Sequence, residues 1–451
     1  MPAASDIPMQ KLRTSEVFVP GGLPQYTYVS RAARNLEERL AAARDNLCKL
    51  VTLTGTTKSG KTVLASRVFP KDGSVWVDGG TVSAEDDLWN FILENIGGYT
   101  DLRTGRSRQT TSTLGGELQA TAGLPLFAHA NAKLAAGGSH TRTGSQSESR
   151  SLSPRSAAIA QLRKTRRPLV IDDFHYLNRP FQGNIVRALK PLVFEGVPVV
   201  LIAIPHRKYD AVKVEREMTG RLEPITIPPW EIDELLAIPT EGFRLLNIRA
   251  DDDIKSHLAA EAYGSPHLMQ EFCRELSRAN NVQETAESPI SILRIDSSLF
   301  RKVAEGTGKV VFDKLATGPR QRTDRIDRQL KDGEKVDIYR AVLLALAHLR
   351  PGLDTISYEQ IRSALRELLV TNVPQGHEVT RVLEKMSEIA SSDEASTPVL
   401  DWEREEQKLH ITDPFFAFFL KWGMTETKQG AAPNAGPATP PANPGGTPGG
   451  P

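Results

Sequence analysis

Eight consecutive residues near the start of the chain have the types and spacing of a phosphate-binding loop. They fit the pattern G-x-x-x-x-G-K-[ST] and follow an alternating apolar run, residues 50–54, that predicts a strand. The eight residues are Gly55, Thr56, Thr57, Lys58, Ser59, Gly60, Lys61 and Thr62. Glycine allows the loop to turn its backbone N–H groups onto a phosphate, and the helix expected from Val63 onward adds partial positive charge. We therefore predict ATP or ADP here, with Lys61 on the β- and γ-phosphates and Thr62 on Mg²⁺.

A second chemical feature is a pair of acids that ends the apolar run of residues 168–171. Such a run predicts a buried parallel strand whose carboxyl end lies at the ligand-binding edge of an α/β sheet. Asp172 is then expected to hold Mg²⁺, and Asp173 to orient or deprotonate the attacking water. The alternative is a strand that ends in a solvated Asp-Asp turn. A third apolar run, residues 197–204, predicts another buried strand and leads into His206 and Arg207.

Length and composition limit the remaining classes. A chain of 451 residues with 39% hydrophobic content can hold two or three packed domains. No apolar run approaches the roughly 20 residues that span a bilayer, no signal peptide is recognisable at the N-terminus, and Cys48 and Cys273 are not expected to form a disulfide. A cytoplasmic protein without a membrane partner is therefore expected. Residues 101–167 hold eleven basic and three acidic residues, a net charge of +8 that could attract a polyanion or simply be solvated.

Periodicity and composition predict the order of domains. We expect a disordered N-terminus over residues 1–16, an ATPase core over 17–230, a helical lid over 231–280, linker helices over 281–335, a winged-helix domain over 336–423 and a disordered Pro/Gly tail over 424–451. Within the core, residues 101–154 read as an insertion, with a hairpin of weak strands over 118–133 followed by a flexible loop. The predicted fold is α/β, with a parallel P-loop NTPase sheet and lid followed by an α+β winged-helix domain.

The order of these motifs, together with the ending Leu409–Trp422, resembles archaeal-type STAND ATPases and the origin-recognition branch of AAA+ proteins. This resemblance implies several further site residues. In those families the polar end of the third strand senses the γ-phosphate, a segment ahead of the first helix covers the adenine, a Gly-x-Pro turn of the lid meets the phosphates, and an arginine before the last strand reaches a neighbour's nucleotide. The matching residues are His206 or Arg207, then Tyr28 and Val29 with Val19, then Pro266 and His267 after Gly264, and finally Arg221 or alternatively Arg216. Each group also has a purely structural alternative. His206 and Arg207 could form a basic surface turn, and Tyr28, Val29 and Val19 could pack in the core. Pro266 and His267 could simply start a helix, and Arg221 or Arg216 could be a lone surface charge.

The resemblance implies a slow ATPase switch that changes conformation or oligomerises when ATP replaces ADP. A separate protein partner is expected, for example in bacterial or archaeal defence signalling, because the chain carries no repeat array or fused effector domain. The alternatives are a DNA-binding ATPase of the origin-recognition or transposition-helper kind and a nucleotide-binding module that barely hydrolyses. Charge favours a protein partner over DNA, since the expected recognition helix, residues 377–390, carries two basic against three acidic residues.

Overall fold

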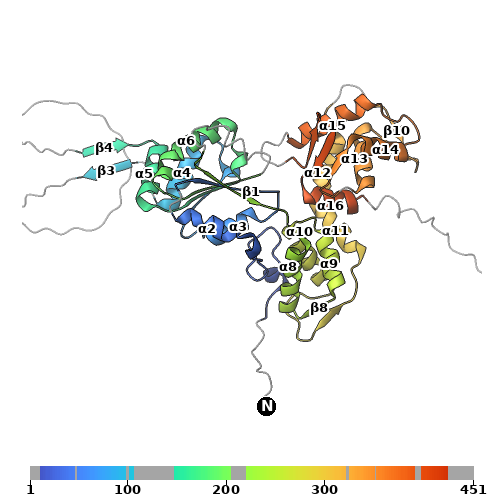
Figure 1. The fold of residues 1–451 in the computed structure, drawn as a ribbon, viewed down its shortest axis with the longest axis horizontal. Helices are drawn as coiled ribbons and strands as arrows, with labels where there is room; N and C mark the ends of the chain where they lie inside the picture. The colour runs from blue at the N-terminus through green and yellow to red at the C-terminus, as the bar shows by residue number, and fades with distance from the viewer. Residues whose placement is uncertain are drawn as a thin grey trace, which may run out of the picture.

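The computed structural model describes residues 11–45, 48–97, 101–105, 147–204, 220–320, 325–350, 352–391 and 398–424 (Figure 1). Its centre is a five-stranded parallel sheet in the order β2-β5-β6-β1-β7. The strands are β1 (Leu50–Gly55), β2 (Val75–Asp78), β5 (Leu169–Asp172), β6 (Val199–Ala203) and β7 (Leu222–Ile227). The predicted α/β class with a parallel P-loop sheet is confirmed. Because all strands are parallel, the ends of β1, β2 and β5 meet at one edge.

Helices cover both faces of this sheet, which explains why its strands are continuous apolar runs. One face packs against α2 (Leu36–Ala41), which follows the short turn η1 (Ala32–Arg34), and against η2 (Ala42–Arg44) and α3 (Lys61–Val68). The other face packs against α4 (Glu85–Ile96), α5 (Pro154–Thr165) and α6 (Arg179–Phe194) (Figure 1). Side chains alternate between the two cores along β6: Val199 and Leu201 face one, Val200 and Ile202 the other. Two short turns, η3 (Gly79–Thr81) and η4 (Phe174–Tyr176), follow β2 and β5. We call these elements and the sheet the sheet domain.

The predicted insertion begins and ends in a ribbon that the sequence pattern does not predict. Strands β3 (Asp101–Gly105) and β4 (Ser147–Ser151) pair antiparallel, with Asp101 opposite Ser151. The hairpin expected over 118–133 and the loop after it lie outside the described residues. The insertion is therefore joined to the sheet domain through two adjacent strands.

The N-terminal segment corrects one prediction. Residues 11–16, expected to be disordered, include the start of α1 (Thr14–Val17) and are bound to the segment that follows the last lid helix. The backbone N–H of Thr14 donates to the carbonyl of Gln283 at 2.8 Å, and its hydroxyl donates to the carbonyl of Val282 at 2.8 Å. Order that comes from such long-range bonds does not require a periodic apolar pattern in the local sequence, so the sequence pattern does not predict it. Residues 1–10 lie outside the described part.

The lid and the C-terminal module follow the sheet. The lid comprises α8 (Ile232–Leu245), β8 (Ile248–Ala250), α9 (Asp252–Glu261) and α10 (Pro266–Ala279), with β8 pairing parallel to β9 (Ile290–Ile292). Helices α11 (Ser297–Thr307) and α12 (Lys309–Thr317) lead to the C-terminal module. That module holds β10 (Arg328–Gln329), β11 (Lys335–Val336), α13 (Ile338–Leu349), β12 (Thr355–Ser357), α14 (Tyr358–Leu368), α15 (Gly376–Ser391), β13 (Leu400–Glu403), β14 (Lys408–Ile411) and α16 (Pro414–Trp422). The three expected helices and the hairpin are present, and β12 adds a third antiparallel strand.

The lid and the C-terminal module share one hydrophobic core that also includes Leu12 and Val17. Its centre is aromatic: Phe272 of α10, Phe300 of α11 and Phe418 of α16 have ring centroids 5.0 to 6.2 Å apart. We call this unit the helical body. The sheet domain has its own separate cores, so the chain consists of two bodies, and it crosses between them twice, over residues 19–31 and 228–231.

Two further expectations concern the environment of the protein. Over the described ranges, no helix has the length and apolar character needed to cross a bilayer. In the same part of the chain neither Cys48 nor Cys273 takes part in a disulfide.

Candidate nucleotide-binding site

The phosphate-binding loop connects β1 to α3 at the carboxyl edge of the sheet. Two residues of the loop adopt left-handed backbone conformations: Gly60, which precedes α3, has a φ of 91°, and Lys58 has a φ of 62°. At Gly55 a Cβ atom would lie 2.8 Å from Ser59 Oγ and 3.1 Å from Ile227 Cβ, so only glycine fits without displacing a neighbour. The sequence motif thus has the expected backbone shape.

Lys61 is the buried cation of the loop. Its ammonium donates to the carbonyls of Gly55 at 3.0 Å and Thr56 at 2.9 Å. Burial lowers the pKa of Lys61 to about 8, and the carboxylates of Asp173 and Asp172 oppose that shift. The Lys61 ammonium is largely desolvated and is hydrogen-bonded only to neutral carbonyls. A hydrogen bond to a negatively charged phosphate would therefore stabilise it strongly.

Three carboxylates face the loop from the ends of two neighbouring strands. Asp172 ends β5 and lies opposite Asp78, which ends β2. Burial raises the pKa of Asp172, the nearby Asp78 raises it further, and hydrogen bonds from the Thr62 side chain and the Asp173 backbone oppose the rise. Sequence reasoning missed Asp78, although it directly follows the apolar run of residues 75–77 and was therefore detectable.

Asp173 follows in a left-handed conformation, with φ 48° and ψ 39°. This backbone conformation is costly for a residue other than glycine, and it aims the side chain away from the strand direction. Burial first, and then the charges of Asp172 and Asp78, raise the pKa of Asp173 to about 6. The carboxyl is still mostly ionised at neutral pH, with a basicity suited to accepting a proton.

The donor set suits Mg²⁺. The Thr62 hydroxyl and the Asp172 carboxylate already share a hydrogen bond, and both are hard oxygen ligands. Burial raises the pKa of Asp172 and Asp173, the neighbouring acids add to the rise, and a cation bound beside the two carboxylates would offset both effects. In the described residues no group of three or more His, Cys, Asp or Glu side chains forms a complete cage. Magnesium would therefore need phosphate oxygens and water as its other ligands.

A cavity of about 650 Å³ lies over the loop and the acids, within the size range of small-molecule sites. One wall is the segment of residues 19–29, which includes Tyr28 and Val29; that these two residues cover an adenine stays a prediction. The Tyr28 hydroxyl donates to Glu37 at 2.5 Å, and the Arg67 guanidinium lies 4.4 Å from the ring centroid. These two contacts hold the Tyr28 ring in place, and a fixed aromatic ring is better suited to stacking on a planar base than a mobile one.

Gln270 of α10 holds this wall and was not predicted. Its side-chain oxygen accepts the backbone N–H of Val19 at 3.1 Å, and its amide donates to the Thr27 hydroxyl at 2.8 Å. The lid therefore sets the shape of the wall formed by residues 19–29. Gln270 lies one helical turn beyond Pro266, so the Gly-x-Pro motif pointed to the right helix but not to this residue.

The head of α10 meets the loop and the C-terminal module at one point. Pro266 and His267 line the cavity as expected. Burial lowers the pKa of His267 to about 4, with Lys58 and Arg274 contributing, so its imidazole is neutral at physiological pH. The ring lies edge-on to Phe415 of α16, with centroids 4.9 Å apart, and Lys58 Nζ lies 5.6 Å from the Phe415 centroid.

Asp413 reinforces this junction. It lies half-buried at the start of α16, where its carboxylate accepts the backbone N–H of Phe416 at 2.8 Å. Burial raises the pKa of Asp413, and the charge of Lys58 opposes the rise. The first turn of α16 thus touches the phosphate-binding loop. Neither Phe415 nor Asp413 was predicted as a site residue, because nothing local in the sequence indicates a contact some 350 residues away.

Four predicted residues remain, of which the structure describes only Arg221. His206, Arg207 and Arg216 lie outside the described residues. Arg221 lies at the amino end of β7, where its carbonyl accepts the backbone N–H of Leu50. That end is about 16 Å along β1 from Gly55, and the Arg221 guanidinium stacks on Phe194 at 5.3 Å. The arginine does not serve the cavity of its own chain, and a role toward a neighbouring copy stays a prediction.

No protein-family model matches the chain, and no curated protein matches its sequence. Several solved structures are similar to it. Cdc6p of Pyrobaculum aerophilum is 12% identical, with 90% of this chain and 96% of that chain covered and a TM-score of 0.42. A Walker-type ATPase of Pyrococcus abyssi is 13% identical, with 88% and 99% covered and a TM-score of 0.48. A STAND protein with a tetratricopeptide repeat sensor from Pyrococcus horikoshii is 14% identical, with 88% and 42% covered and a TM-score of 0.34. An origin-recognition-type protein and a STAND protein, the two kinds named in the predicted resemblance, are thus among the structures to which this chain is similar, and the chemistry of the site is argued from its own geometry.

Proposed function

We propose that this chain is an ATP-binding and hydrolysing switch of the AAA+/STAND type. The proposal is supported by a glycine-shaped loop, a buried lysine and three carboxylates around one cavity. A lysine bound only to carbonyls complements polyphosphate, and clustered acids complement the metal ion that accompanies it. Apart from the nucleotide, the proposal requires no cofactor other than Mg²⁺.

Each residue has a distinct role in this proposal. Lys61 exchanges its two carbonyl acceptors for the β- and γ-phosphates, while Thr62 and Asp172 hold Mg²⁺. The metal ion, when bound, neutralises charge on the phosphate oxygens. Asp173 orients the attacking water and accepts its proton, since its pKa of about 6 leaves it ionised yet basic. Hydrolysis proceeds by in-line attack on the γ-phosphorus, and it is slow unless a neighbouring copy supplies Arg221.

The observation that carries the switching function is the contact of Lys58 and His267 with Phe415. Lys58 belongs to the loop, and Phe415 belongs to the C-terminal module, so phosphate binding at the loop changes the electrostatic environment of that module directly. One cation–π contact supplies about 0.5–2 kcal/mol. A decisive switch between ADP and ATP needs about 5.5 kcal/mol of differential binding. Further contacts to the γ-phosphate, from His267 and from His206 or Arg207, are therefore part of the proposal.

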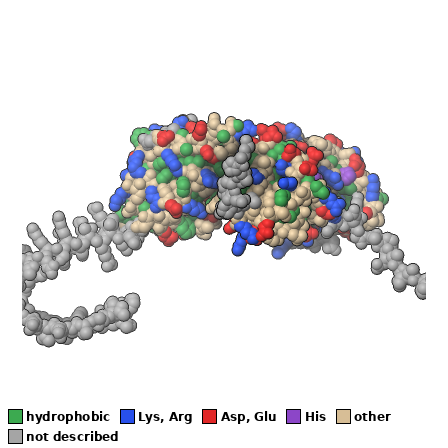
Figure 2. Space-filling view, turned by 90° about the horizontal axis from the view of Figure 1, so that it is seen from below, with side chains coloured by type: hydrophobic (Ala, Val, Ile, Leu, Met, Phe, Trp, Pro, Cys, Tyr) green, Lys and Arg blue, Asp and Glu red, His purple; other side chains and the backbone are tan. Residues whose placement is uncertain are grey.

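A protein partner is favoured over DNA by the charges of the C-terminal module. Two of its basic side chains are engaged with acids: Lys385 lies 2.5 Å from Glu388, and Lys408 lies 2.6 Å from Glu406. On the face of the molecule seen in Figure 2, basic and acidic side chains are interspersed. DNA binding rests on several phosphate contacts from uncommitted Lys and Arg residues. We propose an oligomer in the ATP state that engages a separate protein, and defence signalling is one setting that suits such a switch.

The test is the size of the full chain in solution with ADP and with a non-hydrolysable ATP analogue, each with and without duplex DNA. We expect a larger species with the analogue alone, and no salt-dependent retention on DNA. The Lys61→Ala variant serves as the control that loses nucleotide binding. Equal sizes with both nucleotides would contradict the switch, and assembly that requires DNA would favour the origin-recognition or transposition-helper alternative.

A further inference from the structure

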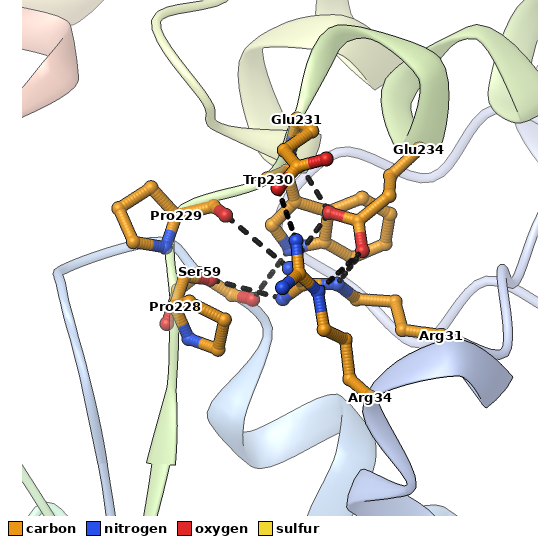
Figure 3. Close-up of polar contacts among 8 residues, drawn as sticks. All are labelled: Arg31, Arg34, Ser59, Pro228, Pro229, Trp230, Glu231 and Glu234. Carbon is orange, nitrogen blue, oxygen red and sulfur yellow. Dashed lines mark hydrogen bonds and ion pairs between the residues drawn. The ribbon is translucent and has the colours of Figure 1, made fainter.

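Arg31 ties together the two crossings between the sheet domain and the helical body (Figure 3). It ends the first crossing, and its side chain is only 4% exposed. Its Nε and Nη2 donate to the two carboxylate oxygens of Glu234 in α8, at 2.9 and 2.7 Å. Its Nη1 donates to the carbonyl of Pro228 at 2.9 Å, and Nη2 also donates to that of Pro229 at 3.2 Å. One buried guanidinium thus holds the second crossing and the first lid helix at once.

The same guanidinium lies over Trp230, the next residue of the second crossing. Arg31 Cζ is 4.9 Å from the centroid of the indole, within cation–π range. The main chain of Trp230 is also held, because its backbone N–H donates to the carbonyl of Gly264 at 3.3 Å. Trp230 is therefore held from two sides at the hinge between sheet and lid.

The indole N–H of Trp230 points back at the phosphate-binding loop and donates to the carbonyl of Ser59 at 3.0 Å (Figure 3). The peptide that joins Ser59 to Gly60 is planar and trans, so its carbonyl and its N–H point in opposite directions. A bond that fixes the Ser59 carbonyl toward Trp230 consequently fixes the N–H of Gly60 on the other side. Gly60 lines the nucleotide cavity, and its N–H is one of the amides available to a phosphate.

We propose that Trp230 is a positioning residue for nucleotide binding, holding the Ser59–Gly60 peptide in its phosphate-binding orientation, with Arg31 as the residue that holds Trp230. This inference rests on the proposed nucleotide-binding function and adds a route of regulation to it. A movement of the lid that shifts residues 228–231 turns one amide of the loop, and phosphate bound to that amide resists the same movement. Nucleotide affinity and lid position are coupled through this one peptide.

The experiment compares binding of a fluorescent ADP analogue with Mg²⁺ by the full-length wild type and by Trp230→Phe, which keeps an aromatic ring under Arg31 but lacks the N–H. Losing one hydrogen bond to the loop is expected to weaken binding about 3- to 10-fold, mainly through faster dissociation. Trp89→Phe is the matched control. It removes another buried indole N–H from the sheet domain, one that donates to Glu85 at 3.4 Å and lies away from the cavity, so its ADP affinity should equal that of the wild type.

A spectroscopic readout separates positioning from general stability. In protein labelled with 5-fluorotryptophan, the ¹⁹F resonance missing from Trp230→Phe belongs to Trp230, and we expect it to shift on addition of ADP. If Trp230→Phe folds poorly, Arg31→Lys is the second variant, because lysine keeps the positive charge but lacks the several N–H donors of the guanidinium. We expect Arg31→Lys to shift the Trp230 resonance and to weaken ADP binding. If Trp230→Phe binds ADP with wild-type affinity and the Trp230 resonance does not shift when ADP is added, this inference is overturned while the proposed function is unaffected. A wild type that binds no ADP would overturn the proposed function and this inference with it.

Discussion

The affinity of this protein for ADP should depend on pH through Lys61. Burial sets the pKa of this ammonium at about 8 in the absence of nucleotide. Phosphate binding needs the charged form and raises its pKa, so protons are taken up on binding above pH 8 and affinity falls as the pH rises. With a pKa of about 8, roughly one molecule in eleven is deprotonated at pH 7 and ten in eleven at pH 9. The dissociation constant should therefore increase about tenfold between pH 7 and pH 9.

The measurement is a titration with a fluorescent ADP analogue from pH 7 to 9.5 at constant ionic strength and fixed Mg²⁺. The phosphates of ADP are already ionised over this range, so the change reports on the protein. Lys61→Arg is the matched control, because guanidinium keeps its charge at these pH values, and its affinity should be flat with pH even if weaker overall. A wild-type dissociation constant that does not change, or a Lys61→Arg variant with the same slope as the wild type, would refute the reasoning.

Three further predictions follow from the described contacts. Asp173→Asn should lower kcat for ATP hydrolysis by about 10²- to 10⁴-fold, and it should remove the acid limb near pH 6 that the wild-type kcat/KM shows as this carboxylate becomes protonated; a persisting limb in steady-state assays would assign it to another group. Phe415→Ala should bring the sizes measured with ADP and with the ATP analogue closer together, since it removes a contact of about 0.5–2 kcal/mol between loop and module; unchanged sizes by light scattering would separate Phe415 from switching. Phe300→Ala should destabilise the lid and the C-terminal module together by about 3–5 kcal/mol in urea unfolding, whereas loss of stability in only one of them would show that the core is not shared.

Functional residues that lie next to one another in the chain could be predicted from the sequence, whereas contacts between distant segments could not. The loop from Gly55 to Thr62 carries its glycines, lysine and threonine in one stretch, and the strands on either side have unmistakable apolar runs. Asp172 and Asp173 were found for the same reason.

Residues that act through tertiary contacts escaped prediction because their neighbours in sequence give no hint of their partners. Trp230 looks like the end of a proline-stopped strand, yet its indole binds the phosphate-binding loop. Phe415 looks like one of several helix-core aromatics, yet it contacts Lys58. Thr14 lies in a polar stretch without periodicity, and its order comes from bonds to residues 282 and 283. In each case a contact between segments far apart in the sequence, and not the local pattern, specifies the residue.

The double crossing between the two bodies constrains how they can move. Both covalent connections pass through neighbouring points, since Arg31 of one is bonded to the carbonyls of Pro228 and Pro229 in the other. A rigid unit attached at two adjacent points can rotate about the line through them but has little freedom to translate or twist around other axes. Whatever rearrangement accompanies the nucleotide cycle should therefore approximate a single-axis rotation, with its smallest displacements beside Arg31 and its largest at the free ribbon of β3 and β4 (Figure 1).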